Sequence, residues 1–187
     1  MKVLGIECSA RADGLTARMT KAALAGAAEA GAEIECVGLA DLTIEHCRMC
    51  DPAGWDLCRK EGRCVIDDDL AGVIEKMQAA DVLVFATPVY FGDLSESAKA
   101  FTDRLRRTAT GHDPRGYLNN LPTVCIAAAG GSGGGTATCM TALEKVLSLP
   151  GCYILDLIPV ARRNEHYKAD VLRLTGKALA AVERPQA

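Results

Sequence analysis

Short runs of apolar residues alternate along the chain with longer segments in which apolar positions recur every three or four residues. The apolar runs cover residues 2–8, 33–39, 81–86, 123–129 and 152–160. Each run has the length of a β-strand, and nearly continuous hydrophobicity is typical of a strand covered on both faces. The pattern therefore predicts five buried strands.

The segments between these runs have the periodicity of amphipathic helices. One helix is expected over residues 14–30, where an Ala-rich stretch ends at Gly31. Another follows the three aspartates at 67–69, because acidic side chains stabilise a helix N-terminus. Three more helices are expected, at 94–105, 136–149 and 167–182.

This alternation predicts an α/β protein with a parallel sheet and helices on both faces. Five such strands suit a flavodoxin-like, doubly wound sheet of order 2-1-3-4-5. No internal repeat or linker divides the chain, so residues 1–187 are expected to form one domain. One long irregular segment, at about 40–66, leaves this pattern and is called the excursion. A structureless loop of that length is usually functional or held in place by a bound group.

Composition narrows the class of protein. Of 187 residues, 49% are hydrophobic, and 21 basic against 24 acidic residues give a net charge of −3. A dedicated nucleic-acid-binding protein would carry a basic stripe, and a membrane span would need about 18 consecutive apolar residues. The first residues turn polar too soon for a secretion signal. We expect a cytoplasmic protein that binds neither nucleic acid nor membranes.

The nine cysteines fall into two sets. Five are dispersed through apolar segments and are interpreted as small core residues, as buried free cysteines usually are: Cys8, Cys36, Cys125, Cys139 and Cys152. The other four lie together in the excursion, separated by two, seven and five residues: Cys47, Cys50, Cys58 and Cys64. Four thiolates fit a [4Fe–4S] cluster or a structural zinc ion. A loop of reduced thiols without metal is the third interpretation, and His46 is interpreted as a loop residue.

The loop after the first strand has features of an anion site. Ser9, Arg11, Gly14 and Thr16 precede or open the first helix. Helix N-termini bind phosphate through free N–H groups and the helix dipole, and an arginine adds a charged donor. The dinucleotide and P-loop motifs are absent. The loop is therefore either a site for a single phosphate or an ordinary helix cap at Asp13 or Thr16.

The loops after the third and fourth strands have an unusual composition. Tyr90 and Phe91 lie beside Pro88 and Gly92, which makes a flat, stiff surface suited to a planar ring. The alternative is that the two aromatic residues cover the core. The glycine-rich run 130–135 either lets the backbone approach a ligand closely or forms a flexible turn.

Four motifs follow one another along the chain: the loop 9–16, Cys-Val-Ile-Asp-Asp-Asp at 64–69, Thr-Pro-Val-Tyr-Phe-Gly at 87–92, and Lys-Ala-Phe-Thr-Asp-Arg at 99–104. Together they resemble the NAD(P)H-dependent FMN reductases and iron–sulfur flavoproteins, from residue 1 to about 160. The resemblance implies non-covalent FMN and an enzyme that transfers a hydride from NAD(P)H through the flavin. The acceptor it implies is a quinone, a free flavin or another small molecule or protein, and the protein is expected to be a homodimer or homotetramer.

The resemblance also implies where the cofactor lies. The first loop holds the phosphate of FMN and the other two hold the isoalloxazine ring. The implied cofactor-binding residues are Ser9, Arg11, Gly14, Leu15, Thr16, Pro88, Val89, Tyr90, Phe91, Gly92, Ala129, Gly130, Gly131 and Ser132. Because the flavin carries the redox chemistry, no catalytic acid or base is assigned, and Tyr90 is expected only to support the ring.

For the four clustered cysteines the resemblance favours iron–sulfur over zinc. The seven-residue gap, which holds the only tryptophan, Trp55, is longer than the two residues typical of the family's cluster motif. Two other functions stay open: an electron carrier with FMN and a [4Fe–4S] cluster, or a four-Cys metal or redox sensor. The basic run at Arg104, Arg106 and Arg107 is interpreted as a set of cations at a helix C-terminus. A site for the 2′-phosphate of NADPH or a subunit contact is its alternative.

Overall fold

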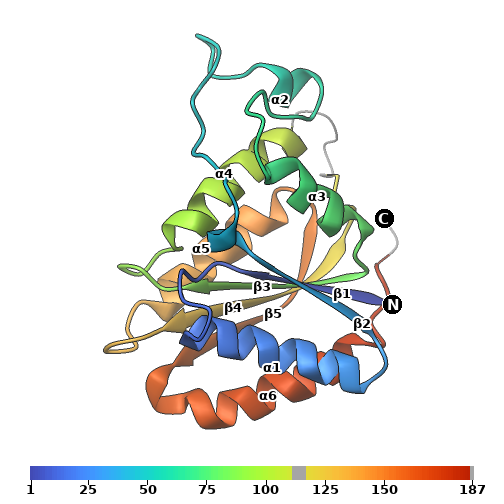
Figure 1. Cartoon of the computed structure of the whole chain (residues 1–187), viewed down its shortest axis with the longest axis vertical. Coiled ribbons are helices and arrows are strands. Elements are labelled where there is room, and N and C mark those ends of the chain that lie inside the picture. Colours follow the sequence, from blue (N-terminus) through green and yellow to red (C-terminus); the bar gives the residue numbers. More distant parts are fainter. Residues whose placement is uncertain (111–116, 186–187) are drawn as a thin grey trace.

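A computed structural model describes residues 1–110 and 117–185, which form three layers around one sheet (Figure 1). The strands are β1 (Lys2–Glu7), β2 (Glu33–Gly38), β3 (Val82–Pro88), β4 (Leu121–Ala129) and β5 (Cys152–Ala161). Neighbouring strands are parallel and their order is β2-β1-β3-β4-β5. The predicted fold class and strand order are confirmed.

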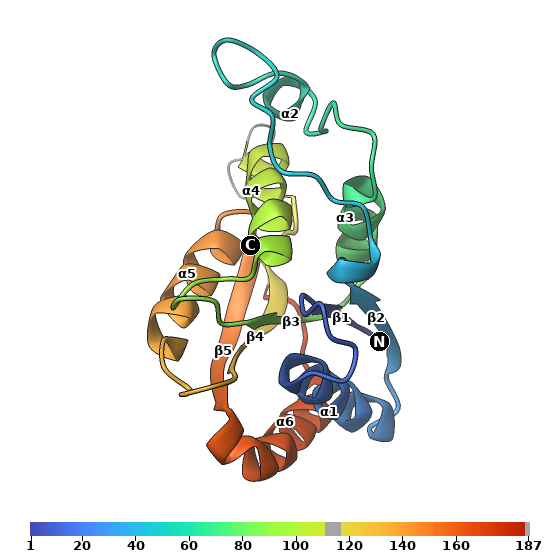
Figure 2. The same ribbon diagram turned by 60° about the vertical axis from the view of Figure 1, so that its left-hand side comes forward.

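Helices cover both faces of the sheet (Figures 1 and 2). On one face lie α1 (Leu15–Glu29) and α6 (Glu165–Leu179); on the other lie α3 (Leu70–Ala79), α4 (Glu96–Thr110) and α5 (Thr136–Ser148). Short helices occur at α2 (Leu57–Lys60), η1 (Leu39–Asp41) and η2 (Arg162–Asn164). None of the described helices is both long and apolar enough to cross a membrane.

Each face of the sheet has its own hydrophobic core. Within β3, Leu83 and Phe85 belong to one core, whereas Val82 and Val84 belong to the other. Successive side chains of a strand point to opposite faces, so a strand between two helical layers needs apolar residues at every position. This arrangement explains the continuous apolar runs in the sequence.

Glycines let α1 and α6 lie in direct backbone contact, side by side in both views (Figures 1 and 2). A Cβ atom on Gly26 would stand 1.9 Å from the carbonyl oxygen of Arg173. One on Gly176 would stand 1.9 Å from that of Ala23. Glycine is therefore required at both positions for this layer to close.

Two predictions about these elements are wrong. Cys36 is exposed rather than buried, because β2 lies at the edge of the sheet; the other four dispersed cysteines are buried as expected. The helix expected from Leu94 begins at Glu96. The Ser95 hydroxyl accepts the N–H of Ala98 at 3.3 Å and so caps a helix that begins two residues later than the apolar pattern suggests.

The excursion leaves the sheet after β2 and rises above α3 and α4 (Figure 2). The aspartates that follow it not only begin a helix but also bind the backbone at its start. Asp69 accepts the backbone N–H of Thr43 at 2.7 Å, and Asp68 accepts that of Glu45 at 2.9 Å. Their side chains therefore tie the two ends of the excursion together, next to the start of α3.

Candidate functional site

A cavity of about 860 Å³ opens at the carboxyl edge of the sheet, between the loops that follow β1, β3 and β4. Its size is in the range of small-molecule and cofactor sites. All fourteen residues expected to bind a cofactor line it. The other lining residues are Ala10, Ala128, Gly134, Gly135, Thr138 and Arg162. Sequence reasoning missed Arg162 because it considered only three of the strand ends, and Arg162 follows β5.

The loop after β1 presents an open helix N-terminus to this cavity. Gly14 is the N-cap of α1 and no side chain caps the helix, so a cap at Asp13 or Thr16 is ruled out. The first-turn N–H groups lack helical partners, and the helix dipole favours an anion beside them. The Ser9 hydroxyl accepts the Arg11 N–H at 3.1 Å and shapes the turn. The start of α1 therefore has free N–H groups that face no capping side chain.

The loop after β3 is held in shape and carries two exposed aromatic residues. Tyr90 and Asp93 exchange two backbone hydrogen bonds of 3.0 Å each. Phe91 has a φ of 52° and its side chain is fully exposed, while Tyr90 is 48% exposed. The alternative that these residues cover the core is therefore wrong. Their side chains instead flank the cavity.

The glycine run packs against that loop. Gly135 has a φ of 80°, and a Cβ atom there would stand 2.7 Å from the Cα of Gly92. The Thr138 hydroxyl donates to the Gly92 carbonyl at 2.6 Å. On the other side, Arg163 donates to the Ser132 carbonyl at 2.9 Å. These contacts fix the run as a wall of the cavity.

Hydroxyl groups at the start of α4 and the end of β3 join the first loop to the second. Both Ser97 and Ser95 donate to the carbonyl of Cys8, the residue after β1, at 2.8 and 3.2 Å. The Ser95 N–H donates to the Thr87 hydroxyl, in β3, at 3.1 Å. The start of α4 therefore sets the position of the first loop relative to the aromatic one.

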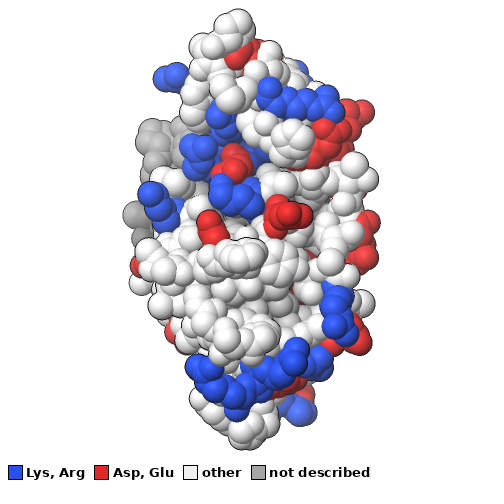
Figure 3. All heavy atoms as spheres, turned by 90° about the vertical axis from the view of Figure 1, so that its left-hand side faces the viewer, with Lys and Arg blue, Asp and Glu red and all other residues white. Residues whose placement is uncertain are grey.

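The middle of the face with the cavity is mostly uncharged, and Lys and Arg gather along its lower border near the starts of α1 and α6 (Figure 3). Basic and acidic side chains are mixed in the upper part of the same face. Arg11 and Arg162 line the cavity itself. Arg18 pairs with Glu165 at 2.6 Å, a contact that raises the pKa of Arg18. Burial raises the pKa of Glu7, at the end of β1. The basic border favours anionic ligands.

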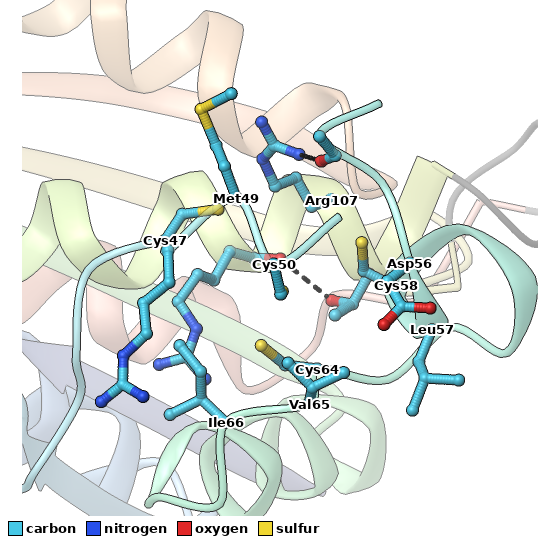
Figure 4. A pocket seen from close by; sticks show the side chains of 14 residues that line it. Cys47, Met49, Cys50, Asp56, Leu57, Cys58, Cys64, Val65, Ile66 and Arg107 are labelled. Atoms are coloured by element: carbon cyan, nitrogen blue, oxygen red, sulfur yellow. Dashed lines mark hydrogen bonds between the residues drawn. The ribbon is translucent and has the colours of Figure 1, made fainter. Parts of the chain in front are cut away.

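A second pocket lies in the excursion, beside α4 (Figure 4). Cys47, Cys50, Cys58 and Cys64 all line it, and all four are free thiols. The cavity between the side chains is about 20 Å³, room for roughly one water molecule. Within residues 1–110 and 117–185, no three His, Cys, Asp or Glu side chains are gathered as one metal ion would require. All four predicted ligands therefore line one pocket, but no three of them are placed to bind the same metal ion.

The seven-residue gap between Cys50 and Cys58 folds back onto α4. The Trp55 ring lies against two guanidinium groups, with Arg107 at 4.7 Å and Arg59 at 5.9 Å from its centroid. Arg107 also donates to the Gly54 carbonyl. These contacts hold the start of α2, and with it Cys58, at the pocket. The longer gap therefore does not carry Cys58 away from the other three cysteines.

Arg104 is not the helix-end cation that the sequence suggested. Because α4 continues to Thr110, Arg104 lies within the helix, and only 1% of its side chain is exposed. Its guanidinium donates two hydrogen bonds to Asp68, of 2.5 and 3.0 Å, and a third to the Glu45 carbonyl at 3.0 Å. Burial raises the pKa of Asp68, but Arg104 and two backbone N–H groups lower it by more. Arg104 and Asp68 form a buried ion pair.

The strand order and the position of the cavity define the chain as a flavodoxin-like α/β protein. A solved structure of a flavodoxin from the domain Archaea has a TM-score of 0.63 and 11% identity, and the match covers 96% of each chain. At that identity the likeness concerns the fold, and it confirms the predicted class.

The model of the NADPH-dependent FMN reductase family matches residues 1–165. The chain belongs to this family, so the resemblance is confirmed. An iron–sulfur flavoprotein of Methanocaldococcus jannaschii is 36% identical over 131 residues, which are 70% of this chain and 65% of the relative. An FMN-dependent NADH:quinone oxidoreductase of Thiobacillus denitrificans is 29% identical over 96% of this chain and 98% of its own.

Proposed function

We propose that this protein uses bound FMN to oxidise NAD(P)H and to reduce a quinone, a free flavin or another acceptor. One observation carries the proposal: all fourteen residues that the family implies for FMN line one cavity of about 860 Å³. When bound, FMN supplies the redox chemistry, accepting the hydride and passing electrons on. The protein contributes binding, orientation and charge.

The first loop suits the phosphate of FMN. The backbone N–H groups of Leu15 and Thr16 lie at the uncapped start of α1, where an anion is stabilised by the helix dipole. Ser9 and Arg11 border the same end of the cavity and add a hydroxyl and a cation. Gly14 keeps this turn compact, because a Cβ atom there would stand 3.0 Å from the Arg11 carbonyl oxygen.

The other two loops suit the isoalloxazine ring. Residues 88–92 offer aromatic side chains, and residues 129–132 offer backbone without bulky side chains. Tyr90 borders the cavity and would support the ring at its exposed side. The open side of the cavity leaves room for NAD(P)H and then for the acceptor to enter in turn. The basic border near Arg162 suits the phosphates of the dinucleotide, of which the family's description favours NADPH.

The first experiment is a fluorescence titration of the flavin-free protein with FMN, followed by steady-state oxidation of NADPH and NADH with menadione as acceptor. Arg11→Ala is expected to weaken FMN binding about tenfold, because a charge-assisted hydrogen bond is lost. Arg63→Ala, in the excursion, where Arg63 pairs with Glu61, is the matched control. Failure to bind FMN after reconstitution would overturn the proposal.

We propose in addition that the four-Cys pocket holds a [4Fe–4S] cluster. Zinc needs all four sulfurs in one shell around a single ion, whereas each cysteine of a cluster binds a different iron at the corners of a cube. The proposal is supported by the four thiols that line one pocket and by the similarity to a protein named iron–sulfur flavoprotein. Such a protein would relay single electrons between the flavin and a protein acceptor, which is the carrier alternative.

Metal analysis with an absorption spectrum of anaerobically purified protein decides this point. We expect about four irons per chain. The absorption spectrum should show a broad shoulder at about 400 nm beside the flavin bands. One zinc ion per chain, or no metal, would overturn the cluster proposal and leave the flavin proposal intact. Size-exclusion chromatography of the same sample tests the expected homodimer or homotetramer. The nine free thiols suit the reducing cytoplasm, which is the location we propose.

A further inference from the structure

The turn that carries Phe91 departs from the residue preference of its class. Tyr90 and Asp93 exchange two backbone hydrogen bonds of 3.0 Å, and the central residues Phe91 and Gly92 have φ values of 52° and 82°. Positive φ at both central positions is the geometry of a type I′ turn, in which Asn-Gly is strongly preferred. Glycine meets this requirement at position 92. A phenylalanine at position 91 does not, because a bulky side chain disfavours the left-handed region.

Exposure is a second unfavourable feature of the same residue. The side chain of Phe91 is fully exposed, whereas Phe85 and Phe101, the other two phenylalanines of the chain, are completely buried. An apolar ring left in water forfeits the free energy that burial would supply. Neither the turn nor the hydrophobic core therefore explains a phenylalanine at this position. Residues held in an unfavourable backbone conformation that the fold does not require cluster where ligands bind.

The position of Phe91 indicates what binds against it. Phe91 lines the cavity at the carboxyl edge of the sheet, and because its side chain is fully exposed, the ring stands at the opening of the cavity. The middle of this face is mostly uncharged, and the basic side chains lie at its lower border (Figure 3). A ligand that enters here meets an aromatic ring and few charges. Such an opening suits a planar, apolar ring better than a phosphate group.

We propose that Phe91 is a specificity-determining residue for the electron acceptor: its ring packs against the planar ring of a quinone that enters the cavity. This inference rests on the proposed function, since the quinone must reach the bound flavin. The two hydrogen bonds of the turn hold the Phe91 backbone in place, so little backbone freedom is lost on binding. Contact between two such rings stabilises the complex beyond the area that it buries. NADPH should depend less on Phe91, because the basic border supplies contacts for its phosphates.

The variant to make is Phe91→Asn, which removes the ring and restores the residue that the turn prefers, so it should fold. Phe91→Tyr keeps a ring at the same position. Met49→Asn is the matched control: Met49 also has a positive φ, of 47°, and an exposed apolar side chain. It lies in the excursion and does not line the cavity.

Two measurements separate binding from turnover. Oxidised, FMN-loaded protein has no electrons to pass on, so a titration with menadione followed by the flavin absorption measures acceptor binding alone. Steady-state kinetics then give kcat/KM for menadione and for NADPH separately. Ferricyanide serves as the comparison acceptor, because it is a small anion without a planar ring.

We expect Phe91→Asn to weaken menadione binding about fivefold and to lower kcat/KM for menadione by about the same factor. Phe91→Tyr and Met49→Asn should stay within about twofold of the unaltered protein in both measurements. In Phe91→Asn, kcat/KM for NADPH and the rate with ferricyanide should also change by less than about twofold.

Three results would overturn the inference. Unchanged menadione binding in Phe91→Asn would show that the acceptor does not use the ring. An equal loss of FMN affinity in that variant would assign Phe91 to the flavin instead. A change of oligomeric state on size-exclusion chromatography, confined to Phe91→Asn, would show that a second copy of the chain covers the ring. An unaltered protein that binds no FMN would overturn the proposed function together with this inference, which distinguishes that failure from the other three.

Discussion

The cavity at the carboxyl edge of the sheet and the cysteine pocket of the excursion are held by different kinds of contact. Backbone groups and glycines at the ends of β1, β3 and β4 form most of the cavity wall, and hydroxyl groups at the start of α4 fix two of its loops. The cysteine pocket depends on side chains, because Arg104 and Arg107 reach from α4 to Asp68, Glu45 and Gly54. The first site follows from the topology of the fold, whereas a few long side chains build the second.

Removing one partner of the buried ion pair should have the largest effect. Asp68→Ala leaves the Arg104 guanidinium buried without its counter-ion, and we expect a loss of about 3–5 kcal/mol in the free energy of unfolding. Urea denaturation followed by circular dichroism measures it. Asp67→Ala is the control, because Asp67 is its exposed neighbour. If both variants unfold at the same urea concentration, the pocket does not depend on this pair.

Because of the same ion pair, part of the free energy of unfolding should be lost in acid. The folded protein lowers the pKa of Asp68, so its contribution is fully present above the ordinary carboxyl pKa of about 4. It is lost as the pH falls through the lower folded value, because protonation then breaks the pair. Thermal melts between about pH 2 and 5 should show a steeper acid decline in the unaltered protein than in Asp68→Asn.

The glycine contact should have the next largest effect, confined to the flavin cavity. Gly135→Ala forces a side chain into the left-handed region and against Gly92, which costs about 1–2 kcal/mol. FMN binding should weaken about tenfold or more, while the metal content stays unchanged. Gly72→Ala, in α3 with no atom within 4 Å of the added Cβ, is the matched control. Equal FMN affinities in the two variants would show that this contact does not shape the site.

Removing the tryptophan should have the smallest effect on stability and a local effect on the cysteine pocket. Trp55→Ala deletes the ring that Arg107 and Arg59 contact, at a cost of about 0.5–2 kcal/mol. The proposed cluster should then lose iron to a chelator faster, with FMN affinity unchanged. Trp55→Phe keeps a ring at this position and should lose iron more slowly than Trp55→Ala. Loss of FMN in either variant would show that the cavity depends on the structure of the cysteine pocket.

The cavity at the carboxyl edge was predictable because its residues follow directly from strand ends. A parallel sheet of known order brings the residues after β1, β3 and β4 to one edge, whatever their side chains are. The exposure of Cys36 was also within reach, because the predicted order already places β2 at an edge. The exposure of Tyr90 and Phe91 could not be predicted, because loop geometry decides whether these side chains turn inward.

Arg104 was harder to interpret, because charge normally marks the exposed side of a helix. Its spacing held a clue, since it follows Phe101 by three residues and precedes Thr108 by four, on the face that the helix buries. What the sequence lacked was the partner. Asp68 lies 36 residues earlier, and only the folded chain brings the two together.

Helix α4 touches both sites, and this has a consequence for how the chain tolerates change. Ser97 contacts the loop after β1 and Arg104 holds the excursion, seven residues and roughly 10 Å of helix apart. Because each residue turns an α-helix by about 100°, a single insertion or deletion between them would rotate Arg104 away from Asp68 while Ser97 stayed in place. The stretch between these two residues therefore has a fixed length and helical phase, even where its side chains vary.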